Sequence, residues 1–148
     1  MTKGQEVIAA IISRITNKGG LENVYDSRAL ESSRDAKLYA VVSESGEQPQ
    51  YANGQARTPL QVAIGITVAI VSVGGDTHEH RDEIAVTNLR TAQEAVESEL
   101  VKRYENLGAI IERLDYTGAS QMLSGEGNLV KIVREIRFNA VYMRVLGE

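Results

Sequence analysis

The sequence predicts a single α+β domain over residues 1–148, in which an antiparallel sheet of long strands carries two helices on one face. Two observations predict this fold. Apolar residues recur at helical spacing in two segments, and in two other segments of about 14 residues they alternate with polar or small residues. The expected order of elements is α-β-β-α-β-β.

The chain begins with an amphipathic helix. One stripe of this helix carries Val7, Ile8, Ile11, Ile12 and Ile15. Gly19 and Gly20 then end the helix, because glycine readily takes the backbone conformation that follows a helix. A polar loop at 26–35 leads to a strand at 37–42.

Residues 43–58 are almost free of apolar side chains and contain Gly46, Pro49 and Gly54. This composition predicts a long exposed loop or hairpin arm. Connections of this length are unusual in compact domains and often have a function. We therefore expect this segment to be functional or mobile.

The longest alternating pattern follows Pro59. Its even positions are all aliphatic: Leu60, Val62, Ile64, Ile66, Val68 and Ile70. Such a pattern predicts a strand with one buried face. Gly65 keeps the second face small, so another backbone or a second subunit can approach there.

A second, longer helix is expected over about 77–106. Asp76 and Glu79 match an N-terminal capping box, and Asp82 and Glu83 place negative charge in the first turn, where the helix dipole favours it. The apolar stripe of this helix is Ala85, Leu89, Ala92, Val96, Leu100, Tyr104 and Leu107, and Gly108 ends it.

The remaining residues predict a hairpin, with a strand at 109–116, a Gly- and Ser-rich turn within 118–128 and a last strand at 130–144. The apolar face of the last strand is interrupted by Arg134. We expect Arg134 either to lie at the sheet margin, where it pairs with an acid of the second helix, or to meet a neighbouring subunit. Strands of about 14 residues are longer than most, so they are expected to form arms or to pair with a neighbour.

Composition excludes several classes of function. The chain has no Cys, which removes disulfides, thiolate metal sites and cysteine nucleophiles and fits a reducing cytoplasm. The net charge is −4, and all of the acidic excess lies in residues 76–105. Binding to nucleic acid needs clustered basic residues, so none is expected. No apolar run approaches the length of a membrane span, and the N-terminal residues do not have the layout of a signal peptide.

His78 and His80 belong to the only cluster with metal-ligand residue types. Two positions apart at the start of a helix, the two rings do not share one helical face, so a solvated helix cap is the preferred interpretation and a metal site the alternative. The sequence contains no nucleophile elbow, no dinucleotide fingerprint and no Walker motif. We therefore expect neither an enzyme nor a cofactor.

The candidate sites are instead contacts with a subunit or partner. Arg57 and Leu60 stand at the start of the first long strand, and Gly65 lies in its middle. Arg134 and Arg137 lie on the last strand.

The layout resembles the tail terminator proteins of tailed phages, among them the lambda-like and Mu-like minor tail proteins. The resemblance covers nearly the whole chain: the opening helix at 7–15, the polar loop, the strand that begins Arg57-Thr58-Pro59-Leu60, the acidic helix, and the final hairpin with its basic strand at 131–144. It rests on element order and composition.

This resemblance implies a structural protein of the virion that is assembled in the host cytoplasm. It implies a homo-oligomer, a hexameric ring that caps the tail tube and joins the tail to the head connector. Its partners would be the tail tube protein, the head connector protein and, in contractile tails, the sheath protein. DNA would pass through the lumen without specific binding.

Two alternatives remain from the residues alone. The chain could be another neck or connector subunit of such a particle, or an oligomeric interaction module outside phages. A metal enzyme or hydrolase centred on His78 and His80 is the least favoured class.

Overall fold

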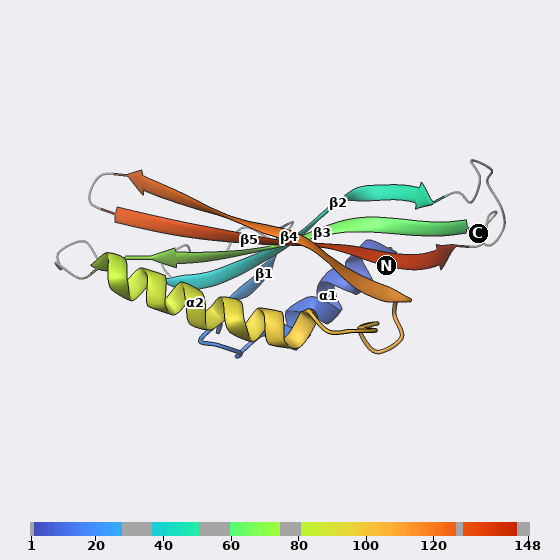
Figure 1. Cartoon of the computed structure of the whole chain (residues 1–148), viewed down its shortest axis with the longest axis horizontal. Helices are drawn as coiled ribbons and strands as arrows, with labels where there is room; N and C mark the ends of the chain where they lie inside the picture. Colours follow the sequence, from blue (N-terminus) through green and yellow to red (C-terminus); the bar gives the residue numbers. More distant parts are fainter. Residues whose placement is uncertain (1, 28–36, 51–59, 75–80, 127–128, 145–148) are drawn as a thin grey trace.

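The computed structural model describes residues 2–27, 37–50, 60–74, 81–126 and 129–144. In these segments two helices, α1 (Lys3–Ile15) and α2 (Arg81–Leu100), pack on one face of a five-stranded sheet (Figure 1). The strands are β1 (Val24–Asp26), β2 (Leu38–Gln50), β3 (Leu60–Val73), β4 (Arg113–Glu126) and β5 (Leu129–Arg144). Their order across the sheet is β1-β2-β3-β5-β4.

The predicted α+β class is confirmed, but the sheet is mixed and not purely antiparallel. The four long strands pair antiparallel, as expected. The short strand β1 pairs parallel with β2, with Val24 opposite Ala40. Three residues are too few to show a period in the sequence, so β1 was not predicted.

The core lies between the helices and one face of the sheet. The even positions of β3 from Val62 to Ile70 are at most 2% exposed, which confirms the alternation. The predicted stripe of α1 is also buried, except that Ile12 is only partly covered. Thr2 and Gln5 begin α1 with a capping box, so two backbone donors of its first turn are satisfied.

The helix α2 ends at Leu100, so the prediction that it continues to residue 106 is wrong. Arg14 of α1 donates a hydrogen bond to the main-chain oxygen of Glu99 (3.4 Å) and forms an ion pair with Glu105. These contacts hold the chain where it leaves the helix. Tyr104 then has a φ of 63°, which a right-handed helix does not contain. The predicted cap at Asp76 lies outside the described residues.

The first half of the predicted loop at 43–58 is a strand. The strand β2 continues to Gln50, and residues 51–59 lie outside the described part of the chain. Between Glu44 and Glu47 the pairing with β3 is offset by one residue, and Gly46 in this bulge has a φ of 96°. The bulge lets a polar stretch containing glycine continue the sheet.

Most of the Gly- and Ser-rich segment 118–128, within which a turn at 124–128 is predicted, is strand. The strand β4 begins at Arg113 and runs to Glu126, while residues 127–128 are outside the described residues. A second bulge, between Tyr116 and Gly118, accommodates the glycine at a φ of 142°. Four strands of 13 to 16 residues result. The lengths of β3 and β5 confirm the two long strands that the alternation predicts, whereas β2 and β4 are longer than the predicted strands at 37–42 and 109–116.

Gly19 joins the turn after α1 to the side of α2. A Cβ added to this residue would lie 2.6 Å from the Cβ of Ala95 and 2.8 Å from the main-chain oxygen of Thr91. Its φ of 58° also disfavours any side chain. Gly108 has a similar φ of 72°, but a Cβ there would meet nothing within 4 Å.

The two glycines therefore give a matched pair of substitutions. We expect Gly108→Ala to lower the free energy of unfolding by about 1 kcal/mol, which is the cost of the left-handed conformation. Gly19→Ala should lower it by about 2–4 kcal/mol, because overpacking against α2 adds to that cost. Urea unfolding of both variants measures the difference, and equal losses would show that the contact with α2 does not restrict Gly19.

Candidate functional site

The structure does not bring the five predicted interface residues into one site. Arg57 lies outside the described residues. Leu60 is the first residue of β3, and its backbone is paired with Arg144. Gly65 and Arg137 lie on the face opposite the helices. Arg134 lies on the helix-covered face.

Arg134 interrupts the apolar row of β5, as the sequence indicated. It stands between the buried Ile132 and Ile136, opposite Ile70 of β3 and Gln121 of β4. Its Nε is buried and has no hydrogen-bond partner among the described residues. Contact between Arg134 and a second subunit stays a prediction.

On the other face, Arg137 is held within the sheet. It donates a hydrogen bond to Ser120 Oγ on β4 (2.9 Å) and lies 3.7 Å from the carboxylate of Glu135. The close approach expected at Gly65 is made by the chain itself, because Ser45 of the β2 bulge occupies the space that a Cβ of Gly65 would need.

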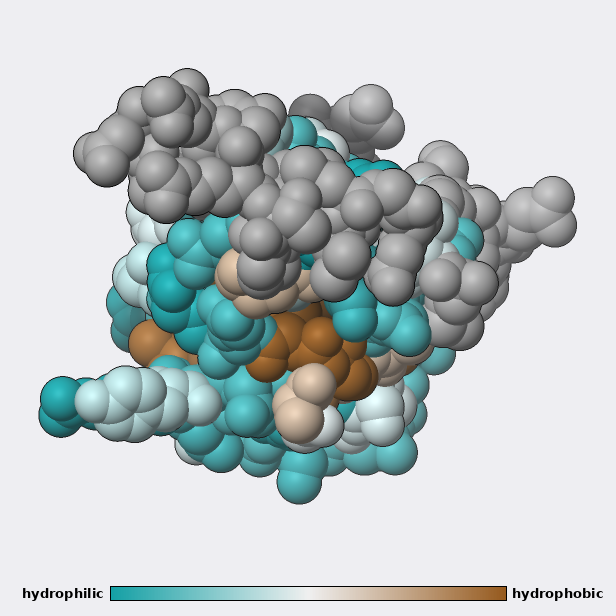
Figure 2. Space-filling view, turned by 90° about the vertical axis from the view of Figure 1, so that its right-hand side faces the viewer, coloured by the Kyte–Doolittle hydropathy of each residue, from teal (hydrophilic) through white to brown (hydrophobic). Residues whose placement is uncertain are grey.

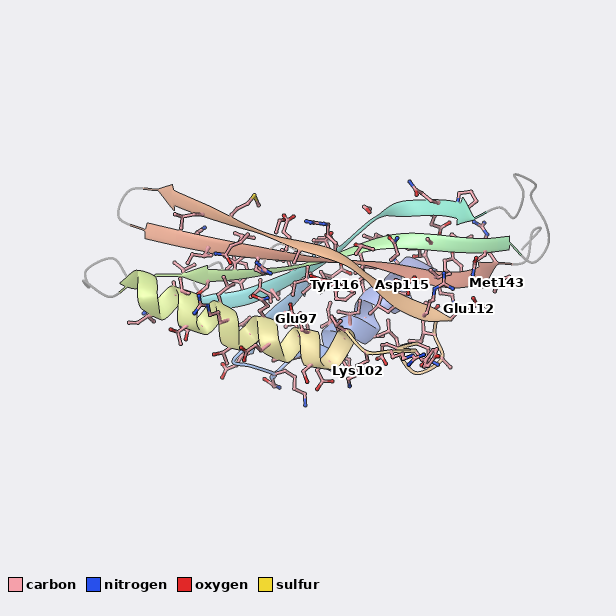
Figure 3. All side chains as sticks on the ribbon, in the orientation of Figure 1. Glu97, Lys102, Glu112, Asp115, Tyr116 and Met143 are labelled. Carbon is pink, nitrogen blue, oxygen red and sulfur yellow. The ribbon has the colours of Figure 1, made fainter. Side chains whose placement is uncertain are left out.

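One groove of the described surface lies where α2 ends and β4 begins. Its volume is about 610 Å³. One wall is the segment after α2, and the other is the first part of β4; Figure 3 shows Lys102 on the first wall and Asp115 and Tyr116 on the second. We call it the tyrosine groove, and its lining is Val101, Lys102, Arg103, Tyr104, Arg113, Leu114, Asp115 and Tyr116.

Two tyrosines expose apolar surface in this groove. Tyr104 is 79% exposed and Tyr116 is 46% exposed. The buried Phe138 meets the ring of Tyr116 edge to face, with 6.1 Å between ring centres, and so orients it. Arg103 lies over the ring of Tyr104, 5.0 Å from its centre. Both rings are therefore presented to the solvent by defined contacts.

The wall that carries Tyr104 has an unusual backbone. Tyr104, Leu107 and Ala109 all have positive φ values, although none is glycine. Such conformations cost free energy and are often found in functional segments. Leu107 offsets its cost by burial, since it is only 3% exposed. Tyr104 is 79% exposed, so burial does not offset its cost.

The tyrosine groove is electropositive in a chain of negative net charge. Arg113 and Asp115 neutralise each other through an ion pair of 2.9 Å. Lys102 and Arg103 make no ion pair with another described residue. Two positive charges therefore remain beside the tyrosines.

Sequence reasoning missed this groove because it placed Tyr104 on the buried stripe of a continuing helix. One signal was present. Lys102 and Arg103 are adjacent basic residues near the end of the acidic segment 76–105.

A second polar cluster lies on β2 beyond the end of β1. The hydroxyl of Tyr142 donates to Glu47 Oε1 (2.8 Å), and Arg144 lies 3.4 Å from Glu47 Oε2. The carboxylate of Glu44 reaches the first turn of α1, where it occupies the space that a Cβ of Gly4 would need. A carboxylate is stabilised at this end of a helix by the helix dipole.

Burial of Tyr142, together with its hydrogen bond to the Glu47 carboxylate, raises the pKa of this phenol from 10.0 to about 12. The neutral phenol is thus favoured by the folded state. Its contribution to stability is complete below pH 10, and it is lost as the pH rises from 10 to about 12.

Among the described residues, no group of three potential ligands could hold a metal ion. His78 and His80 lie outside those residues. No described helix has both the length and the apolar character needed to cross a membrane.

We expect Tyr142→Phe to remove the part of the alkaline loss of stability that comes from the raised pKa of Tyr142. Urea unfolding at several pH values between 8 and 12 should show a shallower decline for the variant than for the native chain. Near neutral pH the variant should be less stable by about 0.5–1.5 kcal/mol, the usual contribution of one hydrogen bond. Parallel declines for the two proteins would contradict the raised pKa.

No protein-family model and no curated protein sequence matches the chain. Its fold is similar to that of a chain in a solved structure described as the virion of a native gene transfer agent particle. The TM-score is 0.58 and the sequence identity 17%, and the match covers 93% of this chain and 94% of that one. The chain thus has the fold, over nearly its whole length, of a subunit found in a virion.

Proposed function

We propose that the chain is a structural subunit of a phage-like virion and that it serves as its tail terminator. The fold likeness to a chain of a gene transfer agent virion, over 93% of this chain, is the observation that carries the proposal. The element order that resembles tail terminators supports the finer assignment. In this role the chain forms a hexameric ring at the end of the tail tube, stops the growth of the tube and provides the contact with the head connector.

The shape of the subunit suits such a ring. The four long strands have 13 to 16 residues, and β4 is the last strand of the described sheet at one edge. Long edge strands are available for pairing with another chain. Figure 2, which faces the end of the molecule at the right of Figure 1, shows apolar surface surrounded by hydrophilic surface. Met143, near that end of β5, is 41% exposed (Figure 3).

The partners follow from the same role. They are the tail tube protein, the head connector protein and, in a contractile tail, the sheath protein. The net charge of −4 suits a lumen through which DNA passes without binding, because anionic walls do not retain the phosphate backbone. Assembly takes place in the host cytoplasm.

The proposal is tested by adding the purified chain to polymerising tail tube protein of the same particle. We expect short tubes of uniform length, each with one ring at an end in electron micrographs, and a hexamer of the free chain in native mass spectrometry. Tube protein without the chain is the control. Tubes that grow equally long in its presence exclude the terminator role.

Labelling the chain within whole particles separates the alternatives. A ring at the junction of tail tube and head connector supports the terminator. A position elsewhere in the neck identifies another connector subunit, whereas absence from the particle would indicate an interaction module outside the virion.

A structural role also makes the histidines dispensable. We expect the double variant His78→Ala and His80→Ala to assemble into the same ring and to cap tubes as the native chain does. Metal analysis of the native protein should find less than one divalent ion per chain. Bound metal, together with loss of assembly in the variant, would reinstate the metal site.

A further inference from the structure

The tyrosine groove and the acidic part of β2 lie at opposite edges of the sheet. The groove borders β4, which is the last strand of the order, whereas Glu44 and Glu47 lie on β2 near the first edge. The short strand β1 is paired only with residues 40–42, so it leaves the half of β2 from residue 43 onward uncovered on that side by any other described strand. The two surfaces cannot meet within one chain.

The register places the two surfaces at the same level along the sheet. Directly opposed residues form rows that share a face of the sheet. One row is Glu44, Ile66, Phe138 and Tyr116, and the next is Glu47, Ile64, Ala140 and Leu114. Both acids therefore lie on the same side of the sheet as Tyr116 and Leu114, which line the groove.

The strand directions also allow the two edges to meet. The strands β2, β3, β5 and β4 alternate in direction across the sheet. When a second copy is placed beside the first in the same orientation, its β2 runs antiparallel to β4 and continues the alternation. The backbone N–H of Leu114 already donates to the main-chain oxygen of Glu105 (2.8 Å), so the neighbour would meet the groove and not this N–H.

The charges of the two surfaces are complementary. Lys102 and Arg103 leave the groove positive. Glu44 and Glu47 are both exposed on β2, but Glu47 shares its carboxylate with Arg144, so Glu44 supplies the negative charge of this surface. Opposite charges orient two partners as they associate, and buried aromatic side chains supply most of the affinity. Tyr104 and Tyr116 are the aromatic side chains available for burial in such a contact.

We propose that the tyrosine groove binds the Glu44–Glu47 part of β2 from a second copy of the chain, so that neighbouring copies join head to tail. The inference rests on the proposed function, because a closed ring requires one such heterologous contact to repeat around it. The occupant of the groove is thus the next subunit of the ring.

Charge reversal tests the contact. We expect the variant Lys102→Glu and Arg103→Glu to self-associate at least about tenfold more weakly than the native chain, measured by sedimentation at several protein concentrations. The matched control, Lys37→Glu and Arg90→Glu, changes the charge equally at exposed positions away from the groove and should associate normally. Adding Glu44→Lys and Glu47→Lys to the groove variant should restore association. Circular dichroism confirms that each variant is folded.

Cross-linking tests the same contact with Glu44 and Glu47 unchanged. Because the chain contains no cysteine, introduced cysteines are the only sites that a maleimide can join. With a short bismaleimide, the single variants Val101→Cys and Gln48→Cys should form dimers at most. The chain that carries both cysteines should form a ladder up to the closed ring, because each contact then joins one groove to one β2.

The outcomes separate this contact from the proposed function. A native ring that is unaffected by the groove reversal, or a doubly substituted chain that stops at dimers, overturns the contact and leaves the ring intact. A native chain that never associates overturns both. A ring that shows the expected charge dependence but does not cap tail tubes overturns the terminator role alone.

Discussion

The strand β3 sets the constraint on which the rest of the fold depends. It is paired along nearly its whole length with β2 on one side and with β5 on the other. Its even-numbered aliphatic side chains form part of the floor on which α2 packs, and they share one buried core with the apolar stripe of α1. A shift of one residue would move all of these side chains to the open face, so the hydrophobic effect fixes the register of the three central strands.

The edges of the sheet are where this constraint ends. The strand β4 has a long strand on one side only, and the uncovered half of β2 is in the same position at the opposite edge. The tyrosine groove and the acidic pair lie at these two edges. The central strands therefore provide stability, and the surfaces that we propose for contact with a second copy lie at the edge strands.

The sequence predicts the helices and strands in which buried apolar residues recur many times at one regular spacing. Examples are the stripe of α1 and the alternation in β3 and β5, where each buried side chain adds to the same pattern. It fails where a single tertiary contact decides the outcome. Arg14 fixes the end of α2 through Glu99 and Glu105, which lie more than 80 residues away in the chain. No local pattern records such a contact.

The candidate site was harder to predict than the fold for a related reason. Tyr104 has helical spacing from Leu100 and was interpreted as a core residue, yet its positive φ turns it outward. Gly65 was correctly predicted to allow a close approach, but the approaching group is Ser45 of the neighbouring strand. A glycine in the sequence indicates that a neighbouring group can occupy the place of a side chain, but it does not identify that group.

The bulge in β2 has a consequence for how chains with this fold should be compared. Glu44 and Glu47 are three positions apart, a spacing that would put them on opposite faces of a regular strand. The extra residue at the bulge places them on the same face. A related chain that lacks the extra residue would present the same pair only if its two acids were two positions apart in the sequence. Insertions and deletions here are therefore changes in surface chemistry, and an alignment that scores only residue identity would misread them.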